Sequence, residues 1–136
     1  MVDVSGKPVM FREAIARGEI RLAAATLRLV QAHTIAKGNV LASARLAGIL
    51  AAKKTADLIP LCHPLPLTHC EVNFEIPKTR DRIVITSSAK ISAQTGVEME
   101  ALTAVAIAAL TIYDMCKAVD KKMRITDIKL VSKIKR

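Results

Sequence analysis

The fold of this chain is decided by residues 98–119, which read EMEALTAVAIAALTIYDMCKAV. Glu98 and Glu100 suit the positive start of a helix, and Lys117 suits its negative end. The residues between them are apolar almost all round, so a helix formed here must be covered on every side. A four-stranded sheet covers only one side. We therefore expect a second subunit to cover the other.

Alternating apolar and polar residues on both sides of this helix predict strands. Residues 72–76 alternate, residues 83–85 repeat the pattern, and the turn at residues 77–81 between them predicts an antiparallel hairpin. Residues 128–135 alternate in the same way and predict a last strand. Residues 11–22 mix β-branched and charged residues around a glycine, and we interpret them as a strand rather than a poor helix.

Two further helices and a rigid loop complete the pattern. Residues 25–32 predict a helix, and Asn39 is placed to cap a second helix that runs to about Lys54. Residues 58–66 form an apolar loop with three prolines, which fix its backbone. The order β, α, α, β, β, α, β predicts a single domain over residues 1–136. Its expected fold class is α+β, a ferredoxin-like sandwich with helices on one face of a four-stranded antiparallel sheet.

The net charge of the chain favours an anionic partner. It has a net charge of +9 and a pI near 9.8, which favours nucleic acid, a membrane surface or a phosphorylated metabolite. Only 2% of its residues are aromatic, so a platform for stacking bases would have almost nothing to stack on. The apolar run at residues 101–113 is shorter than the roughly 20 residues of a membrane span. We expect neither nucleic acid nor membrane as a partner.

The cysteines and the first residues indicate the compartment. Cys62, Cys70 and Cys116 are an odd number, which favours reduced thiols. An acidic residue, Asp3, stands where a secretory signal would be basic. Both features predict a protein that stays in the cytoplasm.

Asp114 and Lys117 are the first candidates for chemistry. They lie three residues apart near the end of the predicted helix 98–119, so their side chains share one face. A surface ion pair is the plain alternative, since such pairs are common and contribute only about 0.3–0.5 kcal/mol. The apolar neighbours of Asp114 favour instead a dry pocket, a raised pKa and a role as general acid or base.

The proline-rich loop offers a second candidate, His63. Cys62 precedes it, and His69 and Cys70 follow, which suggests zinc. Both pairs are directly adjacent, however, and that strains tetrahedral closure, so we expect no metal. Unremarkable loop residues are one alternative. We prefer a loop that presents His63 to a ligand.

Lysines and a glycine supply weaker signals for phosphate. Lys37 stands beside a glycine and Lys53 at a helix end, where either could hold a phosphate, although lysines in such places are more often solvated. Gly96 leads into the start of a helix, where free amides favour an anion. No Walker-type motif accompanies it, which excludes an ATPase or GTPase of that kind.

Three segments resemble the signatures of the MoaC family: KKTADLIPLCHPL at residues 53–65, TGVEMEALTA at residues 95–104 and AALTIYDMCKAV at residues 108–119. Residues 1–5 and 37–48 fit the same pattern, so the resemblance covers nearly the whole chain. It implies a ferredoxin-like fold assembled as a hexamer of three dimers, with each active site at a dimer interface. It also implies a lyase of molybdenum cofactor biosynthesis that works without a cofactor.

The resemblance further implies a substrate. This is a dihydro-GTP whose ribose C3′ is already bonded to guanine C8 by a radical GTP cyclase, and the products are cyclic pyranopterin monophosphate and pyrophosphate. By similarity, Asp114 is the principal acid/base residue, with Lys117 as its partner and Lys37 assisting. The residues that match substrate-binding positions are Leu61, Cys62, His63, Glu98, Met99, Lys53, Arg12 and Asp3.

Two other functions stay open on composition and fold class alone. One is a basic RNA-binding module, because related sandwiches bind RNA on their sheet faces. The other is a catalytically silent oligomeric scaffold. The shortage of aromatic residues counts against the first, and the matched polar residues count against the second.

Overall fold

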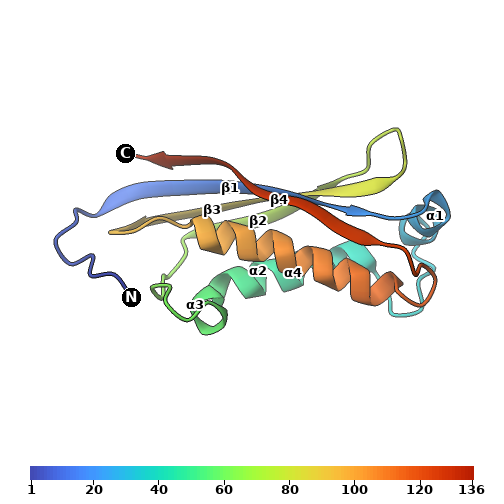
Figure 1. Ribbon diagram of the computed structural model, residues 1–136, viewed down its shortest axis with the longest axis horizontal. Helices are drawn as coiled ribbons and strands as arrows, with labels where there is room; N and C mark the ends of the chain where they lie inside the picture. The colour runs from blue at the N-terminus through green and yellow to red at the C-terminus, as the bar shows by residue number, and fades with distance from the viewer.

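A computed structural model describes residues 1–136 and shows one antiparallel sheet with helices on one of its faces (Figure 1). The four strands lie in the order β2-β3-β1-β4, so the first and last strands of the chain are neighbours. This arrangement confirms the predicted ferredoxin-like α+β sandwich. The elements in chain order are β1 (Met10–Arg21), α1 (Ala24–Gln31), α2 (Val40–Lys53), α3 (Thr55–Leu58), β2 (His69–Glu75), β3 (Arg82–Ala93), α4 (Glu98–Cys116) and β4 (Arg124–Lys135).

Strand β1 is the centre of the sheet. It pairs with β3 in one unbroken register from Met10 opposite Ala93 to Arg21 opposite Arg82, and with β4 on its other side. Its alternate small residues are buried beneath the helices. At Gly18 an added Cβ would lie 2.7 Å from the Val105 side chain of α4, so only glycine lets the helix approach this closely. The strand predicted for residues 11–22 is confirmed.

Strand β4 is the outer neighbour of β1 and is irregular. Its pairing shifts register at two places, between Ile15 and Ala16 and between Arg17 and Glu19 of β1. Asp127 has a φ of +55° within it. These irregularities interrupt the alternation, which explains why the sequence predicted the strand from residue 128 although it begins at Arg124.

Strands β2 and β3 are also longer than predicted. The hairpin is confirmed, but β3 runs on to Ala93 and pairs with β1 over its whole length. A buried serine, Ser87, interrupts its apolar pattern and donates its hydroxyl to the Ala101 carbonyl of α4 at 2.6 Å. A hydroxyl with such a partner can occupy a core position. Strand β2 begins at His69. His69 and Cys70, which follow the proline-rich loop, therefore belong to this strand.

Helices α2 and α4 pack closely on the sheet. A Cβ at Gly48 of α2 would lie only 2.8 Å from the Ala104 carbonyl oxygen of α4, so the two backbones nearly touch. Helix α2 thus covers part of the surface that we expected a second subunit to cover. Exposed apolar side chains remain on the outer side of both helices: Leu46 and Leu50 on α2, and Met99 and Leu110 on α4. Helix α4 ends at Cys116, three residues earlier than predicted.

The helix ends are capped from two sources. Asn39 caps α2, as predicted, by accepting a hydrogen bond from the Ala42 amide at 3.0 Å. Helix α1 is capped by Asp120, far along the chain, which accepts from the Ala23 amide at 3.0 Å and the Thr26 hydroxyl at 2.8 Å.

Helix α4 has the length and apolar composition of a membrane span. Much of it is buried inside the domain, against the sheet and beside α2, as in the core helix of a globular protein (Figure 1).

Candidate functional site

Three predicted catalytic residues meet at the end of α4. The Asp114 carboxylate lies 2.7 Å from Lys37 Nζ and 3.0 Å from Lys117 Nζ. Hydrogen bonds from Lys37 and then Lys117 lower the pKa of Asp114. About half of each side chain is exposed. The expected dry pocket and raised pKa are therefore wrong for the single chain, in which Asp114 is a carboxylate flanked by two ammonium groups.

Local structure brings Lys37 to this place. It stands in the connection between α1 and α2, where the Gly38 amide donates to the Ile35 carbonyl at 3.0 Å. Gly38 has a φ of +115°, a conformation that a residue with a Cβ rarely adopts. The glycine beside Lys37 thus shapes the turn that carries the lysine to α4.

A second set of predicted residues meets at the beginning of α4. They line a cavity of about 340 Å³ between the proline-rich loop and the first turn of the helix. His63 Nε2 lies 2.7 Å from the carbonyl oxygen of Val2, so this nitrogen carries the proton and donates it. The N-terminal segment thereby forms one wall of the cavity. The predicted residues that line it are Leu61, Cys62, His63, Glu98 and Met99.

Glu100 is the residue that the sequence analysis missed. It lines the same cavity and also a neighbouring one of about 410 Å³, whose lining includes Lys53 and Lys54. Only 4% of Glu100 is exposed, and this burial raises the pKa of its carboxyl group. Its place in the first turn of the helix predicts only a favourable interaction with the helix dipole, and nothing in the neighbouring sequence indicates that it is buried.

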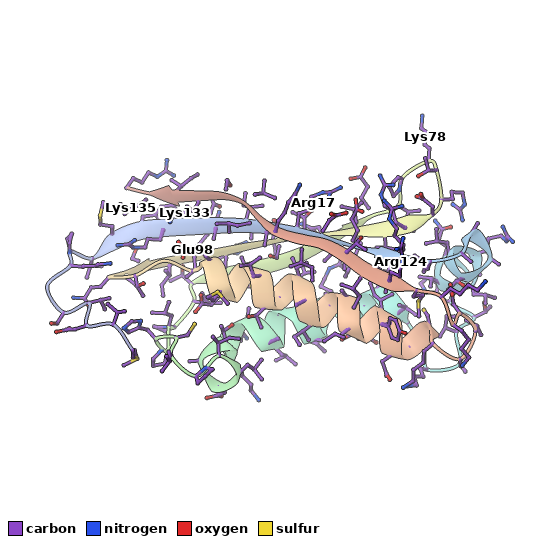
Figure 2. The ribbon with its side chains drawn as sticks, viewed as in Figure 1. Arg17, Lys78, Glu98, Arg124, Lys133 and Lys135 are labelled. Carbon is purple, nitrogen blue, oxygen red and sulfur yellow. The ribbon has the colours of Figure 1, made fainter.

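Arg12 adjoins this second cluster. Its guanidinium donates to the carbonyls of Ala93 and Gln94 at 3.2 and 3.3 Å, and it lines a small cavity of about 150 Å³. Glu98 lines that cavity too and pairs with Lys133 of β4 at 3.3 Å; Figure 2 labels both residues near the start of α4.

Asp3 has different surroundings from the other predicted site residues. It accepts a hydrogen bond from the Ser5 amide at 2.9 Å, which lowers its pKa, and it lines none of these cavities. Its neighbours Val2 and Val4 line the cavity beside His63 instead. The single chain therefore does not bring Asp3 into contact with the other predicted site residues.

The two clusters lie at opposite ends of one helix. Glu98 is the first residue of α4, and Asp114 lies in its last turn. At a rise of about 1.5 Å per residue, their Cα atoms are about 24 Å apart. Acid/base groups must come within hydrogen-bond reach of the substrate atoms on which they act. Within one chain, the residues predicted to serve one active site are therefore split into two halves.

Comparison with known proteins identifies the family. The model of the MoaC family matches residues 1–135. The chain belongs to the MoaC family. Several relatives within the family are named cyclic pyranopterin monophosphate synthase. That of Desulforapulum autotrophicum is 59% identical over 98% of this chain and 82% of its own length. Those of Chloroflexus aggregans and Heliobacterium modesticaldum are each 58% identical over 98% of this chain, and over 81% and 84% of their own lengths.

The segments that first suggested the MoaC family fall on the two clusters. Residues 53–65 and 95–104 supply the cavities at the start of α4, and residues 108–119 supply the pair at its end. No group of three or more histidine, cysteine or acidic side chains is arranged to hold a metal ion. The family signatures therefore mark two half-sites built from loop and helix residues.

Proposed function

We propose that this MoaC-family chain is a cyclic pyranopterin monophosphate synthase, a lyase of molybdenum cofactor biosynthesis. Its substrate is the dihydro-GTP in which ribose C3′ is bonded to guanine C8. It rearranges this nucleotide into cyclic pyranopterin monophosphate and releases pyrophosphate. The names of relatives at 54–59% identity over nearly the whole chain support this function. The net charge of +9 suits a substrate that carries a triphosphate.

The separation of the two half-sites carries the proposal for where the reaction takes place. If two copies pack their α4 helices side by side in opposite directions, the Asp114 end of one lies beside the His63 end of the other. The exposed Met99 and Leu110 of α4, with Leu46 of α2, are apolar surface available for that contact. Each dimer then holds two complete active sites. Three such dimers make the hexamer that the family resemblance implies.

In the complete site, Asp114, Lys117 and Lys37 act as the proton-transfer group. The two ammonium groups keep Asp114 ionised, so it is ready to accept a proton, while either lysine can return one. A second subunit placed over these half-exposed side chains would exclude water and strengthen their interactions with the substrate.

The opposite half-site holds the substrate. Lys53 and Arg12 supply positive charge for its phosphates, and the His63 loop with Glu98 and Met99 surrounds the rest. Glu100, with its raised pKa, is suited to act as a proton donor or a neutral hydrogen-bond partner in this cavity. Asp3 would join them only through movement of the N-terminal segment or through the second copy. We place the enzyme in the cytoplasm, where a radical GTP cyclase supplies its substrate.

Direct turnover tests this function. The cyclised dihydro-GTP is supplied to the purified protein, and pyrophosphate release and pyranopterin formation are followed by mass spectrometry. Asp114→Ala and Lys117→Ala each abolish product formation and leave the assembly intact, because both side chains are half exposed and contribute little to packing. Glu75→Ala in β2, an exposed carboxylate that has no ion pair and lines none of the cavities, serves as the control. Near-normal turnover by either variant contradicts the assignment. A salt-dependent gel shift with RNA and no turnover would favour the RNA-binding module instead.

A further inference from the structure

A second basic region lies where β1 ends and β4 begins, at the same end of α4 as the Asp114 half-site but with no lining residue in common with it (Figure 1). A concavity of about 370 Å³ opens there, and three of its lining side chains are cations: Arg21, Lys122 and Arg124. Arg21 and Arg124 face each other across the β1–β4 ladder. None of these residues belongs to the proposed catalytic or substrate-holding clusters.

The two carboxylates of this concavity are already occupied. Asp120 accepts hydrogen bonds from the Ala23 and Lys122 amides and the Thr26 hydroxyl, which outweigh its burial and lower its pKa. Asp81 accepts from the Thr79 hydroxyl at 2.7 Å and from Arg21 at 3.2 Å. The acidic groups are therefore held by internal donors.

The cations, in contrast, keep free donors. Neither Lys122 nor Arg124 takes part in any ion pair of the chain. Arg21 uses one nitrogen on Asp81 and approaches Glu19 with another at 3.6 Å. A guanidinium has five N–H donors, so several are left over. The concavity thus presents unpaired N–H groups and a positive charge to solvent.

The adjoining face of the sheet also carries more cations than carboxylates. Glu19 is 5% exposed and lies on the face opposite the helices, together with Arg17 at 3.1 Å and Arg82 at 3.2 Å. Figure 2 labels Arg17 and Arg124 on this part of the sheet. Three buried side-chain atoms lack a hydrogen-bond partner, namely Glu19 Oε2, Arg82 Nε and Thr126 Oγ1. Thr126 stands directly opposite Glu19, and Arg82 opposite Arg21, so all three belong to this one network. Five cations here face three carboxylates.

We propose that the concavity formed by Arg21, Lys122 and Arg124 is an anion-binding site that takes the phosphate group of a small molecule, separate from the active site. Guanidinium groups match phosphate oxygens with paired donors, and the lysine adds a compact charge. Inorganic phosphate, pyrophosphate and a nucleotide share this chemistry. Pyrophosphate is also released by the proposed reaction, which would give the site access to a product of the enzyme.

Calorimetric titration of the full-length protein at fixed ionic strength tests the proposal. Pyrophosphate is the main probe, and inorganic phosphate and GTP in separate titrations show whether more phosphates or a base improve binding. The double variant Lys122→Gln/Arg124→Gln is expected to lose one set of pyrophosphate sites, with affinity there weakened roughly tenfold or more. Lys37→Gln, in the proposed catalytic cluster, leaves that set in place.

The control is Lys78→Gln, which removes one charge from the tip of the β2–β3 turn, where Lys78 projects away from the body of the molecule (Figure 2). It leaves pyrophosphate binding unchanged. The double variant also keeps its turnover of the cyclised substrate, so failure of this site is distinguishable from failure of the proposed function. Unchanged pyrophosphate binding by the double variant overturns the proposal. A changed oligomeric mass in light scattering with unchanged binding also overturns it and assigns the cations to contact between copies.

Discussion

The proposed division of the active site between two copies makes a quantitative prediction. Two variants are made, His63→Ala in the half-site at the start of α4 and Asp114→Ala in the half-site at its end. Each variant alone assembles normally and is inactive, because every one of its sites lacks one half. Mixing the two, after dissociation and reassembly, restores activity.

The extent of recovery follows from the geometry. Asp114 lies in the last turn of α4, whereas His63 lies in the loop beside the first turn, whose Glu98 is about 24 Å along the helix from Asp114, so each site takes one end from each copy. In a mixed dimer, one site contains both substitutions and the other contains neither. If subunits mix at random in equal amounts, half of the dimers are mixed, and recovered activity is about a quarter of that of the unmodified enzyme.

The matched control uses two substitutions in the same half-site. Lys37 and Asp114 are 2.7 Å apart in one chain, so a mixture of Lys37→Ala and Asp114→Ala contains no intact half-site at this end. Its activity stays at the level of the two parents. Pyrophosphate release is measured in both mixtures, and native mass spectrometry establishes that mixed dimers have formed. Mixed dimers without recovery in the His63→Ala and Asp114→Ala mixture refute the shared site.

Three further predictions concern stability. Gly48→Ala places a methyl group 2.8 Å from the Ala104 carbonyl and should lower the free energy of unfolding by about 1–3 kcal/mol in urea, whereas Gly6→Ala, with nothing within 4 Å, leaves it unchanged. Asp120→Ala removes the cap of α1 and should cost about 1–3 kcal/mol at pH 7. Because the folded-state pKa of Asp120 is lowered, this stabilisation is present above about pH 4 and fades in acid, so urea midpoints that stay equally far apart at low pH contradict it. Glu100→Gln should be more stable than the unmodified protein at pH 8, because burial raises the folded-state pKa of Glu100 and its ionisation therefore costs stability. The difference in free energy of unfolding disappears below about pH 4, and a difference that does not change with pH rules this explanation out.

Much of the fold could be predicted from periodicity, because the elements concerned have a regular apolar or capping pattern within their own sequence. Helix α4, the Asn39 cap and the β2–β3 hairpin are of this kind. The ends of β3 and β4 could not be predicted in this way. In β3 a serine replaces an apolar residue in the core, and its acceptor, the Ala101 carbonyl, is not visible in a local window. In β4 the register shifts break the period of two on which strand prediction depends.

The candidate site was less predictable than the fold. Helical spacing paired Asp114 with Lys117, but nothing local indicated that Lys37 would close on the same carboxylate from 77 residues away. The sequence predicted a raised pKa for Asp114, but its pKa is lowered. The apolar neighbours in sequence point to other faces of the helix, while Asp114 itself is half exposed. The prediction for Glu100 was wrong in the opposite direction. A carboxylate in the first turn of a helix is usually solvated, but Glu100 is buried and its pKa is raised. Burial depends on tertiary neighbours, which neighbours in sequence do not identify.

The irregular course of β4 affects more than its own pairing. A straight strand of twelve residues at the rim of a sheet would offer an unbroken row of amide and carbonyl groups to any stray polypeptide, and fibrous aggregates grow from such rows. The two register shifts and the left-handed conformation at Asp127 bend this row, while Lys129, Lys133 and Lys135 surround it with like charges. The edge strand that is most exposed to unwanted pairing thus carries its own obstacle to uncontrolled polymerisation, which the proposed assembly of several copies would require.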